Sequence, residues 1–251
     1  MMPPAMLAVG CEWVKTGTGP AHDQHEEAWA RASEAVKGFA PSLALQSSTG
    51  PAETCWLTSV ASYDALGKNN ELYDKDPAYA AAMPSLVGND GKFVSDFRSY
   101  IAVLRPDLSS GEMPNVLTRR MTEWGEWRIR PGNGAAFDKA VKLYTAAAKR
   151  AGVNPEFRVF QVMQGAPGDT YWIFTSQKSM AGFDAMMASD PKIFAAFTAD
   201  DSKFFGDFFT KVVSVSSNLW TYSSAQSTLS AEQRASDPFW KLKPKAAQKK
   251  P

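Results

Sequence analysis

The sequence predicts an α+β protein in which two β-α-β-β-α-β repeats pack sheet to sheet within one chain. The first observation is a set of short sequence matches that divides the chain into two copies. In chain order, the matched segments are Glu12-Trp13 with Glu126-Trp127, Glu53–Trp56 with Asp169–Trp172, Asp76-Pro77 with Asp190-Pro191, and Gly91–Phe97 with Ser202–Phe208. The partners lie 111 to 116 residues apart in a conserved order, so we infer an old duplication. The second observation is that both copies show the same order of strand and helix signals.

The first copy opens with an apolar segment, Ala5–Lys15, which ends at a Gly-Thr-Gly turn and is typical of a strand. Pro20 suits the first turn of a helix that extends through an Ala- and Glu-rich segment to about Phe39. The remaining elements are strands at Ser42–Ser48 and Glu53–Ser62, a partly helical segment at Tyr63–Pro84 that restarts at Asp76-Pro77, and a turn and strand within Lys92–Arg105.

The second copy repeats this order. A strand at Thr122–Arg130 precedes a helix whose apolar face is marked by helical spacing from Phe137 to Ala151, with Gly152 as its C-cap. Then follow a hairpin of Phe157–Gln164 and Thr170–Gln177, helices at Met180–Ala188 and Lys192–Thr198, and a last strand within Phe205–Trp220.

The β-α-β-β-α-β order is that of the ferredoxin-like unit, whose helices cover only one face of the sheet. In a duplicated chain the second sheet can cover the other face, which gives an intramolecular α/β barrel. The predicted organisation is a first repeat at 5–107, a linker at 108–120, a second repeat at 121–223, and a polar, Lys-rich tail at 224–251. We expect that tail to be partly disordered.

The composition of the chain limits the classes of partner that it can bind. The chain has 251 residues, 44% of them apolar, and a net charge of +1. Such a charge disfavours a general nucleic-acid binder, and no apolar run is long enough to span a bilayer. The chain start shows no signal peptide, so the sequence predicts a soluble protein that is either cytoplasmic or exported with the signal peptide already absent. A small-molecule ligand is the expected partner, and a homo-oligomer stays open.

The two cysteines, Cys11 and Cys55, fall on strands that the predicted fold makes neighbours. We favour two small buried apolar side chains over a disulfide, although the sequence leaves both open. Neither cysteine has a spacing typical of a metal site.

The strand–loop–helix segment Glu126–Gly132 with Phe137, and the strand–helix segment Tyr171–Ser176 with Phe183, carry a family resemblance. On these residues the chain resembles the dimeric α/β-barrel superfamily, which includes antibiotic-biosynthesis monooxygenases, haem-degrading monooxygenases, and EthD-like and NIPSNAP-like proteins. The resemblance covers almost the whole chain, once per copy, and implies a barrel built within one chain.

The resemblance also implies site residues. Monooxygenases of this kind often carry a Trp on the third strand, a position that Trp56 and Trp172 match. Haem-degrading members add an Asn on the first strand and a His on the second helix, and chlorite-dismutase-type members place a His in the second unit. Here Gly10, Cys11 and Glu12 occupy the first strand, and neither second helix carries a His. The whole second copy also lacks His. No cofactor is therefore expected, and a haem is disfavoured.

The only histidines, His22 and His25, lie three residues apart at the start of the first helix. If the two first helices are aligned 112 residues apart, His25 takes the place of Phe137 on the face that points at the sheet. Such an imidazole can act as a base or orient a ligand, although a solvated His is ordinary in a first helical turn. His22 and His25 could share a metal ion, but no third ligand is marked by spacing, so no metal site is predicted.

Glu12 and Glu126 occupy matching strand positions, each followed by a Trp. They are either charges in the sheet interface or carboxylates that line a pocket. The predicted catalytic residues are His25 and Glu12. The predicted ligand-binding residues are Trp56, Trp29, Trp172, Phe137 and Glu126.

Three functions are compatible with these residues. The first is binding of a small apolar or aromatic molecule between sheet and helices, including catalysis as a cofactor-independent monooxygenase-like enzyme. The second is a non-catalytic barrel that serves assembly, and the third is a haem protein. The replacement of His25 by Phe137 predicts that copy one keeps the pocket and that larger side chains fill copy two.

Overall fold

The computed structural model describes residues 5–112 and 114–242. The first copy contains four strands and three helices. Strand β1 (Met6–Val14) is followed by helix α1 (Gly19–Ala35), strands β2 (Ser42–Ser47) and β3 (Glu53–Val60), helices α2 (Tyr63–Lys75) and α3 (Pro77–Phe93), and strand β4 (Val94–Leu104). A short 3-10 turn, Val116–Thr118, lies in the connection to the second copy.

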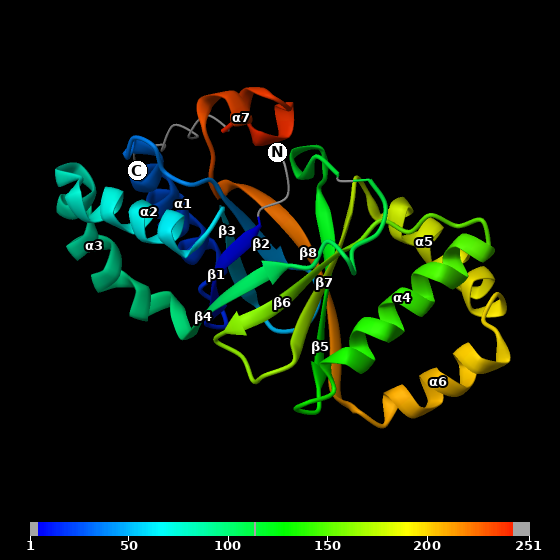
Figure 1. The fold of residues 1–251 in the computed structure, drawn as a ribbon. Helices are drawn as coiled ribbons and strands as arrows, with labels where there is room; N and C mark the ends of the chain where they lie inside the picture. Colours follow the sequence, from blue (N-terminus) through cyan, green and yellow to red (C-terminus); the bar gives the residue numbers. More distant parts are fainter. Residues whose placement is uncertain (1–4, 113, 243–251) are drawn as a thin grey trace.

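The second copy has the same order. It consists of β5 (Met121–Ile129), α4 (Gly134–Arg150), β6 (Arg158–Gln164), β7 (Thr170–Gln177), α5 (Met180–Ala195), α6 (Ala199–Phe209) and β8 (Val212–Thr228). A one-turn helix α7 (Ala231–Ala235) and a 3-10 turn (Pro238–Trp240) follow β8. The barrel lies in the middle of Figure 1, with α1–α3 on one side and α4–α6 on the other.

The eight strands form one closed antiparallel barrel in the order β1-β3-β2-β8-β5-β7-β6-β4. Each copy contributes four adjacent strands, and the pairs β2–β8 and β4–β6 join the copies at both seams. Closure leaves neither half-sheet with a fully unpaired edge strand. The predicted fold, two ferredoxin-like repeats packed into one intramolecular barrel, is confirmed.

Local signals explain where the helices begin. Ser62 caps α2 by accepting a hydrogen bond from the N–H of Ala65, and Asp76 caps α3 by accepting one from Tyr79. Pro77 at the first turn of α3 therefore starts a new helix, which splits the second helix of the repeat into two. Thr198 and Asp201 form a reciprocal capping box at α6. Because of this cap, the segment that was expected to begin the last strand is helical until Phe209.

The structure redefines which residues of the two copies are equivalent. Gly19 and Gly134 each begin a 17-residue helix, and they lie 115 residues apart. Gly17 and Gly132, at the same separation, both have a positive φ in the preceding turn. The first strands agree, since both bear a register shift at corresponding positions, Trp13/Val14 and Arg128/Ile129. The sequence match of Gly91–Phe97 with Ser202–Phe208 is consequently not a structural equivalence: the former spans the junction of α3 and β4, and the latter lies inside α6.

The barrel interior is an apolar core in which aromatic rings dominate. Trp124 lies 4.8 Å from Trp172 and 5.4 Å from Trp220, measured between ring centroids. Aliphatic side chains of β1, β2 and β3 complete this core. Alternate residues of the same strands point outward to the helices, as the period of two in a strand requires.

The segment after residue 223 departs from the expected tail. β8 continues to Thr228, and Trp240 is fully buried against the barrel core. Its indole N–H donates to the carbonyl of Leu117 at 2.6 Å, and Asp237 pairs with Arg120 at 2.6 Å. Residues 224–242 thus form folded structure that is attached to the 108–120 connection. The remainder of the expected tail, 243–251, lies outside the described residues.

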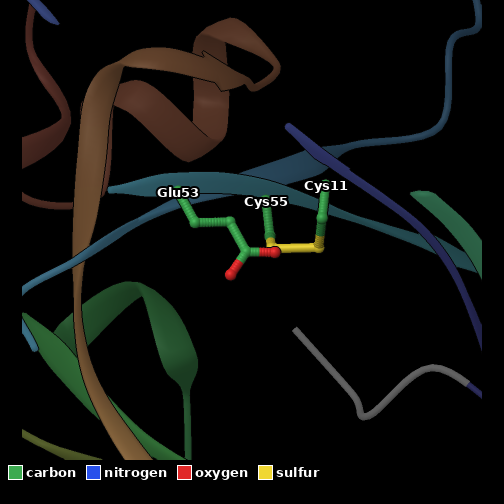
Figure 2. Close-up of side chains that lie close together, drawn as sticks. All are labelled: Cys11, Glu53 and Cys55. Atoms are coloured by element: carbon green, nitrogen blue, oxygen red, sulfur yellow. A yellow bond between two sulfur atoms is a disulfide. The ribbon is translucent and has the colours of Figure 1, made fainter. Parts of the chain in front are cut away.

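Cys11 and Cys55 form a disulfide, which corrects the preference for two free thiols. The two residues are direct partners across β1 and β3, with their Cα atoms 4.1 Å apart. The carboxylate of Glu53 lies beside this bond, with Oε1 3.8 Å from the Sγ of Cys55 (Figure 2). The sequence could place both cysteines on neighbouring strands but could not give the register that sets them opposite each other. In the part of the chain that the structure describes, no helix has the length and apolarity to cross a membrane.

Candidate functional site

A cluster of five ionisable side chains lies between the sheet and the helices of copy one. Helix α1 contributes His22, His25 and Glu26, which its period of 3.6 residues places on adjoining parts of one face. Glu12 reaches the cluster from the helix-facing side of β1, and Asp90 reaches it from the last turns of α3. The consecutive elements β1 and α1 therefore meet α3, which is distant from them in the sequence.

Glu12, His22 and Glu26 form the buried inner part of the cluster, which we call the inner triad. His22 Nε2 lies 3.0 Å from Glu12 Oε2 and 3.9 Å from Glu26 Oε1. The exposed fraction is 1% for His22 and 4% for Glu26, so neither group is hydrated from the surface. Buried polar groups normally find partners. Here Glu26 Oε1 and His22 Nδ1 have no hydrogen-bond partner among the residues that the structure describes.

The electrostatics of the cluster act mainly on Glu26. Burial, and then the neighbouring carboxylates Glu12, Asp90 and Asp23, raise the pKa of Glu26 from its ordinary 4.5 to about 9. Burial disfavours a charged carboxylate, and nearby negative charges add to that effect. Without a cation, Glu26 is therefore protonated at neutral pH.

His25 and Asp90 form the outer part of the cluster, which we call the outer pair. His25 Nε2 lies 2.6 Å from Asp90 Oδ1, and the indole N–H of Trp29 is 3.2 Å from the first atom and 3.3 Å from the second. The ring of Phe93 lies 5.3 Å from the imidazole. The side chain of Asp90 is 31% exposed, so the outer pair connects the buried triad to the surface.

Copy two has apolar side chains at all of these positions. The residues equivalent to Glu12, His22, His25 and Glu26, each 115 positions later, are Trp127, Phe137, Ala140 and Val141. The counterpart of Asp90 is Phe208. The carbonyls of Phe93 and Lys211 accept equivalent hydrogen bonds, and Asp90 and Phe208 each lie three residues before them. Phe137 stacks on Tyr171 with ring centroids 4.1 Å apart. The polar cluster is therefore specific to copy one.

The structure brings together some of the predicted site residues and separates others. His25, Glu12 and Trp29 belong to the cluster or contact it. Trp56 also lies on a helix-facing strand position, where its indole N–H donates to the carbonyl of Gln226 at 3.3 Å. Phe137 lies in the corresponding layer of copy two.

Trp172 and Glu126 lie elsewhere, on the barrel side of the sheet. The indole N–H of Trp172 donates to Glu126 Oε2 at 3.0 Å, and Trp172 belongs to the interior core. Because equivalent residues of β3 and β7 differ by 117 positions, the counterpart of Trp56 is Ile173 rather than Trp172. A slip of one residue in a strand reverses the face, so Trp172 and Glu126 share no pocket with Phe137.

Sequence reasoning did not identify the roles of Glu26 and Asp90. Glu26 carried a usable signal, since it lies four residues after His22 and hence on the same helix face. Asp90 carried none, because a contact between residues 65 positions apart depends on the fold.

Copy two offers no histidine that could hold a haem iron. Both histidines of the chain lie next to carboxylates in copy one, and the matching layer of copy two is occupied by stacked aromatic rings. Cys11, Glu53 and Cys55 also bring possible metal-ligand atoms close together in space. Their two sulfur atoms, however, are bonded to each other.

Two open grooves mark the surface of copy two. The larger, of about 670 Å³, runs between α4 and residues 107–110, and the smaller lies along α4. None of the predicted site residues lines either groove.

Solved structures share the fold of this chain at low sequence identity. A candidate monooxygenase from Fusobacterium nucleatum subsp. nucleatum aligns with a TM-score of 0.54 and 10% identity, over 88% of this chain and 94% of that one. An anthrone oxidase-like protein aligns with a TM-score of 0.59 and 14% identity, over 92% and 99%. Chlorite dismutase from Candidatus Nitrospira defluvii, in complex with imidazole, aligns with a TM-score of 0.50 and 8% identity, over 88% and 92%. No family model matches the sequence, and no curated protein is similar to it. These similarities establish the fold.

Proposed function

We propose that this protein binds a small aromatic molecule at the cluster of copy one and oxidises it with molecular oxygen, in the manner of a monooxygenase-like enzyme. One observation carries the proposal. Five ionisable groups occupy the layer between helices and sheet in one copy, and apolar side chains occupy every equivalent position in the other. Buried polar groups without a full set of partners destabilise a fold, so a cluster of ionisable side chains in this layer of copy one alone supports a chemical role.

The fold neighbours support the choice of substrate class. An anthrone oxidase-like protein and a candidate monooxygenase share the barrel. Anthrone is a suitable model substrate because its C10 methylene is acidic, and its enolate is electron-rich enough to react with oxygen directly.

The outer pair supplies the proton acceptor. Asp90 holds His25 through a contact of 2.6 Å, which orients the imidazole as a carboxylate does in other acid–base sites. His25 removes one proton from C10, and the resulting enolate forms a carbon–oxygen bond with O2. Cleavage of the O–O bond and loss of the second C10 hydrogen complete the reaction. One anthrone and one O2 give one anthraquinone and one water.

Access to the cluster is expected between α1 and α3. Asp90 lies on α3 and is partly exposed, and Phe97 at the start of β4 is 58% exposed. α3 packs chiefly on α1 and makes few contacts with the sheet, so we expect a ligand to enter by a displacement of α3. Trp29 and Phe93 then offer aromatic surfaces next to the imidazole.

Oxygen uptake with anthrone tests this function. The protein as purified should consume O2 faster than a blank. His25→Ala, which introduces the residue found at the equivalent site of copy two, should lower the rate by roughly 100-fold, the usual contribution of a general base. Glu27→Gln, a neighbouring change on the same helix, should leave the rate unchanged. Uptake no faster than the blank, or uptake equal in His25→Ala and the parent protein, would refute the proposal.

A further inference from the structure

We propose that the inner triad, Glu12, His22 and Glu26, binds a divalent transition-metal ion. One imidazole nitrogen and two carboxylate oxygens lie within 4.8 Å of one another, and all three side chains are largely buried. The residues come from two consecutive elements, β1 and α1. This inference goes beyond the oxidation proposed above, since it concerns ion binding in the absence of any substrate.

The unpaired atom of Glu26 is the main argument. Its Oε1 is buried, has no hydrogen-bond partner within 5–112 and 114–242, and lies 3.9 Å from His22 Nε2 and 4.0 Å from His25 Nε2. A buried carboxyl oxygen that is left without a partner lowers folding stability. An ion placed among Glu12, His22 and Glu26 provides a partner for this oxygen and neutralises both carboxylates.

The comparison of the copies is an independent argument. The three ligands are replaced in copy two by Trp127, Phe137 and Val141, which cannot bind metal. Because copy two carries Val141 at the position of Glu26, the fold does not require a buried carboxyl group there. Copy two shows that the same layer can be filled by apolar packing alone.

The donor set indicates the class of ion. Mg²⁺ and Ca²⁺ favour sites made of oxygen atoms alone, and Cu⁺ favours sulfur, whereas imidazole with carboxylates suits Zn²⁺, Mn²⁺, Fe²⁺ and Co²⁺. Three protein ligands leave at least one coordination position open for water or another small ligand. The outer pair lies beside the inner triad, since His25 Nε2 is 4.0 Å from Glu26 Oε1.

Calorimetric titration with Co²⁺ and with Zn²⁺ tests the inference. Tag-free full-length protein is stripped with a chelator, and the d–d absorption of added Co²⁺ reports its coordination. We expect one ion per chain to bind, with the spectrum of a site containing nitrogen and oxygen donors. Glu26→Gln and His22→Phe should each weaken binding by about 100-fold or more, because each removes one of three ligands.

Two controls make the result decisive. Glu26→Gln keeps the size of the side chain and has no charge to bury, so a normal thermal transition of the metal-free variant shows that its fold is intact. Glu27→Gln should bind Co²⁺ as the parent protein does. Absence of saturable binding, or equal affinity in the parent, Glu26→Gln and His22→Phe, would overturn the proposal. Because no substrate is present, a failure of anthrone oxidation has no bearing on this test.

Discussion

His22 in α1 occupies the position that Phe137 occupies in α4. Both residues are 1% exposed and lie three residues after the glycine that begins their helix. Phe137 stacks on Tyr171, whereas His22 contacts Glu12 and approaches Glu26. The two copies therefore share one scaffold, which holds an aromatic core in copy two and the cluster of ionisable side chains in copy one.

Phe137→His should destabilise the protein strongly. The imidazole would replace a ring stacked at 4.1 Å and would lie beside Trp127 and Val141, which offer no carboxylate. Loss of the aromatic contact and burial of an unpaired polar group together should lower the free energy of unfolding by about 3–5 kcal/mol. Urea denaturation measures this change. Phe137→Leu should lower the free energy of unfolding clearly less. Equal decreases in the two variants would contradict a contribution from the buried, unpaired imidazole.

Removal of the Cys11–Cys55 disulfide should also lower stability. The bond closes a loop with a sequence separation of 44 residues, and restricting the unfolded chain in this way contributes up to about 4 kcal/mol. The Cys11→Ala/Cys55→Ala variant should therefore unfold at lower urea concentration than the oxidised parent. Thiol titration of the denatured, unreduced parent should detect no free thiol. Two free thiols per chain would contradict the pairing.

Glu53 should make stability depend on pH. Burial raises its pKa above the ordinary 4.5, and nearby Glu126 adds to this effect, while a hydrogen bond with Trp13 and the charge of Arg98 oppose it. The folded state then holds a proton that the unfolded state has released. The free energy of unfolding consequently falls as the pH rises from 4.5 through the raised pKa. In Glu53→Gln this contribution should disappear. Identical pH profiles of stability for the variant and the parent would argue against a raised pKa.

Trp240 should anchor the segment after β8. It is fully buried and donates to the Leu117 carbonyl, while the neighbouring Asp237 pairs with Arg120. Trp240→Ala should lower the free energy of unfolding by about 3–5 kcal/mol, as expected for the loss of a buried Trp. Leu242→Ala is the control, since Leu242 is 38% exposed and should cost little. Similar unfolding midpoints for Trp240→Ala and the parent would show that the segment does not stabilise the barrel.

The sequence predicted the fold because alternation, turn residues and helix caps are local signals, and both copies carry them in the same order. It did not give the correct equivalence of residues. A helix alignment shifted by three positions changes the buried face little, since three residues are close to one turn, and so His25 rather than His22 was paired with Phe137. In strands the shift matters more. The sequence match pairs Glu12 with Glu126, whereas its structural counterpart is Trp127. Because neighbouring strand residues point to opposite faces, this match joins two residues that lie on different sides of the sheet.

The functional residues were predictable to the extent that they lie close together in the sequence. His25 and Glu12 were identified as candidates, and the neighbouring Glu26 belongs to the same helix face. The contact of Asp90 with His25 depends on how α3 lies against α1, and no local pattern encodes that. Likewise the pairing of Cys11 with Cys55 depends on the register of β1 with β3.

The central claim is that the cluster of copy one is the reactive part of the molecule, and imidazole NMR tests it most directly. The chain has two histidines, one in the inner triad and one in the outer pair, so a long-range ¹H–¹⁵N spectrum of tag-free protein shows both and nothing else of their kind. The account predicts that Zn²⁺ shifts the ring nitrogens of His22 most, and that anthraquinone-2-sulfonate, an unreactive analogue of the anthrone product, shifts those of His25. Two imidazoles that respond to neither titrant would contradict it.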